Sequence, residues 1–193
     1  MLPLTACRGN EKPKKEEPLL RVIIGIWTYL MLLRRLLLAH LMVVNDGSPT
    51  PESAFPITNV TLSQAFYSRV VAGTADYYRF TAAPDTSLRM SMLVPENHHT
   101  AGFRATLTLT GPGLPPAGLV LPAGDAGKRF GTTVYRRTHQ AGLELAGGTY
   151  LIEIRGTTTG VYCFCVGTRE PDEYADAATR TRVHALLALA PGT

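Results

Sequence analysis

The stretch GGTYLIEIRGTTTGVYCFCV, from Gly147 to Val166, contains two short runs of alternating character separated by glycine and threonine. The first run covers 149–155 and the second 161–167. The five residues between them are Gly-Thr-Thr-Thr-Gly. Two such runs bounded by turn residues are typical of paired β-strands, so the stretch predicts a β-hairpin.

The second run has two distinct faces, because side chains alternate along a strand. The larger apolar face is expected to point into a hydrophobic core. One face carries Tyr162, Phe164 and Val166, and the other carries Val161, Cys163 and Cys165.

The chain has three cysteines, Cys7, Cys163 and Cys165. The last two share a strand face, where Cα atoms two residues apart lie roughly 6.5–7 Å from each other, at or beyond the usual disulfide limit. We therefore predict no bridge between them. Small buried thiols are expected to pack as apolar side chains, while ligation of a soft metal or a bridge to another chain stay open as alternatives.

Short strand patterns also occur at close spacing upstream of this stretch. They lie at 64–70, 76–81, 88–94, 103–110, 132–136 and 142–145, with a Gly/Pro-rich stretch at 111–127. No helical period separates them. This arrangement predicts an all-β fold, an antiparallel jelly-roll-like β-sandwich spanning 57–168.

The positive charge of the chain is confined to its N-terminal part. The 193 residues carry a net charge of +4, with 19 basic and 15 acidic side chains. Residues 1–44 contain seven basic and three acidic side chains, so the remainder has 12 of each and is neutral. No nucleic-acid partner is predicted for the folded domain.

Residues 1–18 form a polar lead, and 19–44 form a hydrophobic segment that is expected to be helical. The segment is long enough to cross a hydrocarbon layer of about 30 Å. Its two adjacent arginines each cost about 2.5–3.5 kcal/mol at a bilayer centre. The expected anchor residues are Val22, Ile23, Ile24, Trp27, Leu30, Leu33, Arg34 and Arg35.

Three interpretations of this segment stay open. It is a signal anchor with its basic lead in the cytoplasm, a cleaved signal peptide that begins near Met31, or an amphipathic helix buried in a soluble protein. The first two export the β-domain, which is then periplasmic or extracellular and is membrane-anchored or, after cleavage, secreted. Residues 45–56 are expected to be a linker, and the tail 169–193 a short helix from about 171 to 190.

Two motifs resemble a known family. GTADYYRFTA at 73–82 resembles the opening strand of bacterial pre-peptidase C-terminal domains, and AGGTYLIEIRG with GVYCFCV resembles their closing hairpin. The resemblance covers 57–167 and implies a small jelly-roll-like sandwich of secreted or surface proteins, usually appended to a peptidase and not catalytic. Where many members carry acidic residues suited to calcium, 111–127 has only Asp125, so no metal site is carried over.

Four polar residues are the candidate ligand contacts, each with a structural alternative. Asp76 either contacts a ligand at the rim of the sandwich or accepts local backbone hydrogen bonds. Tyr77 either stacks on a sugar or packs. His98 and His99 are expected in a loop, where adjacent imidazoles point apart and no carboxylate or cysteine lies at metal-ligand spacing.

Catalytic templates are missing from the sequence. It contains neither G-x-S-x-G nor H-E-x-x-H, and no dinucleotide fingerprint follows a strand. We therefore predict a protein that is not an enzyme and needs no cofactor. The expected function is that of a membrane-anchored, extracytoplasmic binding or scaffolding module with protein partners, such as an accessory subunit of a membrane complex. The alternative is a secreted carbohydrate-binding or surface-adhesion module that takes a glycan.

Overall fold

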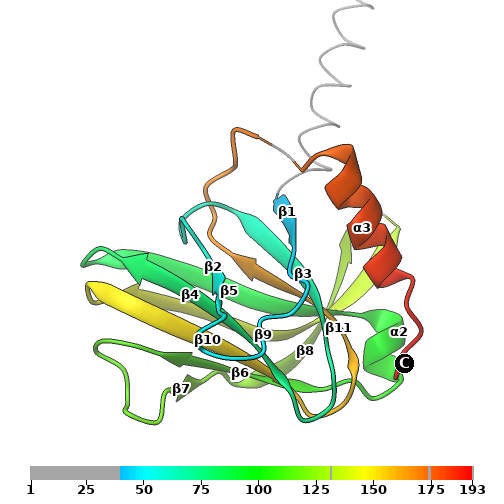
Figure 1. The fold of residues 1–193 in the computed structure, drawn as a ribbon, viewed down its shortest axis with the longest axis horizontal. Helices are drawn as coiled ribbons and strands as arrows, with labels where there is room; N and C mark the ends of the chain where they lie inside the picture. The colour runs from blue at the N-terminus through cyan, green and yellow to red at the C-terminus, as the bar shows by residue number, and fades with distance from the viewer. Residues whose placement is uncertain (1–39, 131, 174, 193) are drawn as a thin grey trace, which may run out of the picture. The chain divides into compact units, whose positions relative to one another are not determined.

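Two β-sheets face each other across a shared core in the computed structural model, which describes residues 40–130, 132–173 and 175–192 (Figure 1). Sheet A has the strand order β1-β3-β11-β5-β9-β8, and sheet B the order β2-β4-β10-β6-β7. The predicted all-β sandwich is confirmed. The strands are β1 (Leu41–Val44), β2 (Phe55–Pro56), β3 (Gln64–Val70), β4 (Ala75–Ala82), β5 (Thr86–Pro95), β6 (Ala105–Thr110), β7 (Leu119–Val120), β8 (Ala123–Phe130), β9 (Thr133–Leu145), β10 (Gly148–Gly156) and β11 (Gly160–Val166).

Most of the N-terminal predictions lie outside the described residues. The polar lead 1–18, the anchor residues from Val22 to Arg35, and Cys7 all belong to this part of the chain. Within the described ranges, no helix is long and apolar enough to cross a membrane. Anchoring by the hydrophobic segment stays a prediction.

The core between the sheets is built from alternate residues of each strand. Tyr162, Phe164 and Val166 of β11 are buried in it, as their alternation predicted. The Phe164 ring lies 5.2 Å from that of Tyr78, which in turn meets Phe66 edge-on at 5.4 Å. Burying each such side chain stabilises the fold by about 1.5–3 kcal/mol, so this layer is the main source of stability.

The predicted hairpin at 149–167 is wrong, because its two strands belong to different sheets. β10 pairs with β4 and β6 in sheet B, while β11 pairs with β3 and β5 in sheet A. At the link, the Gly156 amide donates to the Thr74 carbonyl at 3.1 Å. A Cβ on Gly160 would lie 2.4 Å from the Phe103 ring. Both strands bury a large apolar face, which suits opposite walls of one core.

The sandwich begins earlier than predicted. Leu41–Val44, assigned from sequence to the hydrophobic segment, form β1 and pair in parallel with β3. In the predicted linker 45–56, Asn45 and Ser48 are buried, and β2 pairs with β4. The Ser48 hydroxyl donates to the Tyr77 carbonyl at 2.7 Å. These segments satisfy backbone groups that the sheet edges would otherwise expose.

The β8 and β9 region also differs from the prediction. The Gly/Pro-rich stretch 111–127 contains β7 and the first part of β8, and the runs 132–136 and 142–145 are parts of the single strand β9. β9 pairs with β5 along its length, with a register shift between Met92 and Leu93 of β5. The middle of β9 has little strand pattern in its own sequence, and its pairing with β5 holds it in the strand conformation.

Two short helices complete the fold. α3 (Ala177–Leu187) is shorter than the predicted helix 171–190, because the Asp176 carboxylate accepts the Thr179 amide at 2.7 Å and caps its start. α3 contacts β1 and β3 and buries Val183 against the outer face of sheet A (Figure 1). α2 (Glu96–Thr100) occupies the position of the predicted histidine loop.

Candidate functional site

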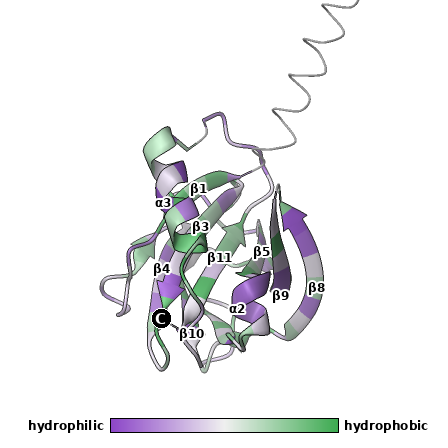
Figure 2. Ribbon diagram, turned by 90° about the vertical axis from the view of Figure 1, so that its right-hand side faces the viewer, coloured by the Kyte–Doolittle hydropathy of each residue, from purple (hydrophilic) through white to green (hydrophobic). Residues whose placement is uncertain are grey.

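The outer face of sheet A is concave and forms a groove. β1 and β8 are the two edges of the sheet, yet the His40 ring, just before β1, meets the Phe130 ring at the end of β8 edge-on at 6.1 Å. Figure 2 shows β8 as a curved strand at the right-hand side of the molecule. The His40 Nδ1 lies 2.5 Å from the Ser63 hydroxyl. Burial, and secondly the charge of Lys128, lower the pKa of His40, so it is neutral at pH 7.

The groove has a volume of about 630 Å³, within the range of ligand-binding pockets. Basic and neutral polar side chains line it, together with a few apolar ones. None of the described residues that line it is an aspartate or glutamate. The residues that give the groove its chemistry are Arg89, Ser91, Lys128, Arg137, Gln140 and Cys165.

The strand register explains how these side chains meet. On β5, Leu88, Met90 and Met92 face the core, so Arg89 and Ser91 face the groove. Arg89 is opposite Gly142 of β9, where a Cβ would lie 2.8 Å from an Arg89 guanidinium nitrogen. Glycine therefore leaves the space in which Arg89 lies across β9.

The positive charges of the groove are not neutralised within the described residues. Arg89 and Lys128 make no ion pair there, and Arg137 donates only to the neutral Gln140 at 2.7 Å. The Lys128 ammonium lies 4.6 Å from the centre of the Phe130 ring. A concave surface with several cations and no acidic side chain attracts anions.

Cys163 and Cys165 are both free thiols, with sulfur atoms 3.6 Å apart. The hydrogen bond from the Cys163 thiol is the main reason that the pKa of Cys165 is lowered, with smaller contributions from Lys128, Ser91 and Arg137. Burial raises the pKa of Cys163 well above its usual value. Cys165 is therefore the member of the pair that ionises first.

Asp76, the first residue singled out from sequence, lies between the sheets and not at the rim. It is 3% exposed. Its carboxylate accepts the Ser48 amide at 3.1 Å, the Ser68 hydroxyl at 2.7 Å and the Tyr162 hydroxyl at 2.7 Å. A buried carboxylate with three hydrogen-bond donors of this kind ties β3, β4 and β11 together, and its burial fits the structural alternative.

Tyr77 offers no open ring face for a sugar. It is 8% exposed, and its hydroxyl donates to Glu153 at 3.0 Å. Arg155 joins the same group through its own bond to Glu153 at 2.6 Å. The position fits the packing alternative.

His98 is buried in α2, with 1% exposure. Its Nδ1 accepts the Val161 amide at 3.4 Å, and its Nε2 has no hydrogen-bond partner of good geometry, although the Leu189 carbonyl lies near. Burial lowers its pKa. The residue is therefore a neutral, buried side chain that packs between α2 and β11.

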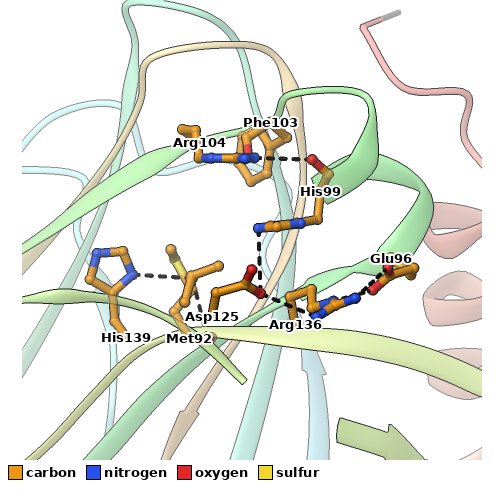
Figure 3. Close-up of polar contacts among 9 residues, drawn as sticks. Met92, Glu96, His99, Phe103, Arg104, Asp125, Arg136 and His139 are labelled. Carbon is orange, nitrogen blue, oxygen red and sulfur yellow. Dashed lines mark hydrogen bonds and ion pairs between the residues drawn. The ribbon is translucent and has the colours of Figure 1, made fainter. Parts of the chain in front are cut away.

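His99 takes part in a chain of polar contacts that Figure 3 displays. Its Nε2 lies 3.9 Å from Asp125, which pairs with Arg136 at 3.5 Å, and Arg136 binds Glu96 at 2.7 Å. Arg136 lowers the pKa of Glu96. The chain fastens α2 to β8 and β9. No group of three or more metal-ligating side chains occurs in the described part of the protein.

The structure thus places none of the four ligand candidates from sequence in the groove, and it assembles a site from residues of which sequence analysis had considered only Cys165. Lys128 and Arg137 come from the consecutive strands β8 and β9, and Arg89 comes from β5, which is next to β9 only in the folded sheet. The alternation of β5 alone could have placed Arg89 on the outer face. Because the net charge of the domain is zero, the charge count does not indicate this local cluster of cations.

A β-sandwich with a basic groove on one outer face is thus the class of protein that the fold and site define. No protein-family model matches the chain, and no curated protein matches it. Among solved structures, it is similar to the pre-peptidase C-terminal domain of a Bacillus anthracis collagenase, with 18% identity over 60% of this chain and 95% of that one, at a TM-score of 0.40. The likeness to this family that the motifs predicted is thus found among solved structures.

Two further similar structures are PliG proteins, periplasmic inhibitors of g-type lysozyme. The Salmonella Typhimurium protein is 15% identical over 60% of this chain and 99% of its own, with a TM-score of 0.37. The Aeromonas hydrophila protein is 15% identical over 68% of this chain and 100% of its own, with a TM-score of 0.36.

Proposed function

We propose that this protein is a non-catalytic, extracytoplasmic binding module that holds an acidic segment of a protein partner in the groove of sheet A. The observation that carries the proposal is the set of three cations, Arg89, Lys128 and Arg137, in a groove without acidic lining residues. The hydrophobic sequence that precedes β1, at 19–40, supports export and anchoring of the domain.

Peptide carboxylates suit this groove better than nucleic acid does. Guanidinium groups bind carboxylates through paired hydrogen bonds, and Arg89 and Arg137 both have donors to spare. Phe130, which is half-buried, adds apolar surface that a peptide backbone and side chains can cover. Outside residues 1–44 the chain has equal numbers of basic and acidic side chains, which does not provide an extended basic footprint for a phosphate backbone.

The arrangement around the groove favours binding over catalysis. His40, the histidine that lines the groove, bonds Ser63, and no hydrogen bond among the described residues joins it to Cys165. A thiol without an adjacent base lacks the usual partner of a nucleophilic enzyme. The carbohydrate alternative has no comparable support, because Tyr77 and His98 are buried.

Fluorescence anisotropy with a labelled glutamate-rich peptide tests the proposal, with a glutamine-rich peptide of the same length as the neutral probe. The full chain in mild detergent should bind only the acidic peptide, and added salt should weaken binding. Lys128→Gln should cost about 1 kcal/mol, or roughly fivefold in Kd. Arg129→Gln is the matched control, because Arg129 is the next residue of β8 and faces the other side.

Equal binding of the two peptides would contradict the proposal. So would a loss of affinity in Arg129→Gln as large as that in Lys128→Gln, because it would indicate that only the overall charge of the domain matters.

A further inference from the structure

The groove contains a reactive group in addition to its cations, the thiol of Cys165. We propose that Cys165 is a covalent modification site, at which its thiolate attacks the disulfide of a small anionic peptide disulfide and keeps half of it as a mixed disulfide. The proposal goes beyond reversible binding, but it uses the same cations and in that respect rests on the proposed function.

The two neighbouring cysteines have different access to the groove. Cys165 is 8% exposed and lines the groove, whereas Cys163 is 2% exposed and is not among the lining residues. The Cys163 sulfur lies 3.6 Å from that of Cys165, close enough for its thiol to donate a hydrogen bond to a Cys165 thiolate. Cys165 is therefore placed to react, and Cys163 to stabilise the reacting form.

Ionisation of the pair favours the same assignment. The Cys163 hydrogen bond lowers the pKa of Cys165 most, burial opposes this, and Lys128, Ser91 and Arg137 lower the pKa further. The thiolate is the nucleophile in exchange with disulfides. The groove cations that attract an anionic reagent thus also support the charge of the attacking sulfur.

The exchange needs no reagent other than the incoming disulfide. The Cys165 thiolate attacks one sulfur of the incoming disulfide, a new S–S bond forms, and the original S–S bond breaks. The other half leaves as a thiolate and takes a proton from water. Cys165 is oxidised and the leaving half is reduced.

The reaction is expected to stop at the mixed disulfide. Attack by Cys163 would join two residues of one strand, whose Cα atoms are roughly 6.5–7 Å apart, at the limit of disulfide geometry. The strand β11 is hydrogen-bonded to β3 on one side and β5 on the other, so its backbone has little freedom to contract. The adduct on Cys165 therefore persists until an external thiol removes it.

Incubation of the full chain with glutathione disulfide in mild detergent at neutral pH, followed by peptide mapping with mass spectrometry, tests this inference. One glutathione should appear on Cys165. Bis(2-hydroxyethyl) disulfide is the neutral probe. For each disulfide, the rate of its reaction with the protein is divided by the rate of its reaction with free cysteine, which corrects for the different reactivities of the two reagents. The corrected preference for glutathione disulfide should be roughly tenfold, the low end of electrostatic focusing in a charged cleft. It should fall in Lys128→Gln and persist in Arg129→Gln.

The inference is overturned by adducts only on Cys163 or Cys7, by a bridge between Cys163 and Cys165, or by equal corrected rates for the two probes. Mapping on the unmodified sequence makes the result independent of whether a cysteine variant folds. Binding of the acidic peptide to Cys165→Ser separates the two proposals. If the peptide binds and no adduct forms on the wild-type protein, only the modification site is refuted; if both fail, the binding groove is refuted as well.

Discussion

Replacement of Asp76 by alanine is expected to destabilise the protein strongly, because three donors point at its carboxylate from different strands and a loop. The Ser48 amide, the Ser68 hydroxyl and the Tyr162 hydroxyl lie 2.7–3.1 Å from its oxygens. Tyr162 can turn its hydroxyl toward Tyr78, whose oxygen is 2.8 Å away. The Ser48 amide and the Ser68 hydroxyl have no such alternative among their described hydrogen bonds.

The size of the effect follows from these contacts. Each buried donor without an acceptor costs about 1–3 kcal/mol, so the two that cannot turn away give a loss of about 2–6 kcal/mol on replacement by alanine. Asp76→Asn keeps one carbonyl oxygen but turns an NH₂ group toward a donor, and about 2 kcal/mol is expected.

Urea unfolding of the full chain in mild detergent measures both variants, with Asp172→Asn as the control for the same change at an exposed carboxylate. The control should stay within about 0.5 kcal/mol of the wild-type protein. A loss below about 1 kcal/mol in Asp76→Ala would refute the structural role. The residue would then have to be reconsidered as a ligand contact.

Three further changes follow from the same structure. Gly160→Ala should cost about 1–3 kcal/mol in urea unfolding, because the new methyl group meets an aromatic ring, whereas Gly127→Ala, in open space, should cost almost nothing. Gly142→Ala should weaken acidic-peptide binding roughly threefold by displacing Arg89, with unfolding unchanged. Burial lowers the pKa of His139 in the folded state, so the free energy of unfolding should be constant above about pH 7 and fall toward about pH 5, less so in His139→Gln. The same dependence of the unfolding free energy on pH in the wild-type protein and in His139→Gln would contradict the assignment of this effect to His139.

The sequence was most informative where side-chain alternation alone determines the outcome. The strand predicted at 64–70 has the same bounds as β3, and the inward face of β11 is the predicted one. Alternation specifies which side chains are buried, but it does not specify the sheet to which a strand pairs. For this reason the stretch 149–167 was predicted as a hairpin, although β10 and β11 face each other across the core.

The groove could not be predicted because it depends on long-range pairing. Lys128 and Arg137 lie on the consecutive strands β8 and β9, whereas Arg89 is about 40 residues away in sequence and joins them only when β5 pairs with β9. The part of the chain around Lys128 also lacks strand pattern and follows a Gly/Pro-rich segment, and β8 is defined mainly by its pairing with β9. The motif residue Asp76 was visible in sequence, but its burial between the sheets was not.

A crystal structure of the protein with a glutamate-rich peptide is the most direct test of the binding groove. We expect the peptide on the outer face of sheet A, with carboxylate oxygens about 3 Å from the guanidinium groups of Arg89 and Arg137. A peptide seated on sheet B or on α3, with the groove empty, would contradict the proposed function.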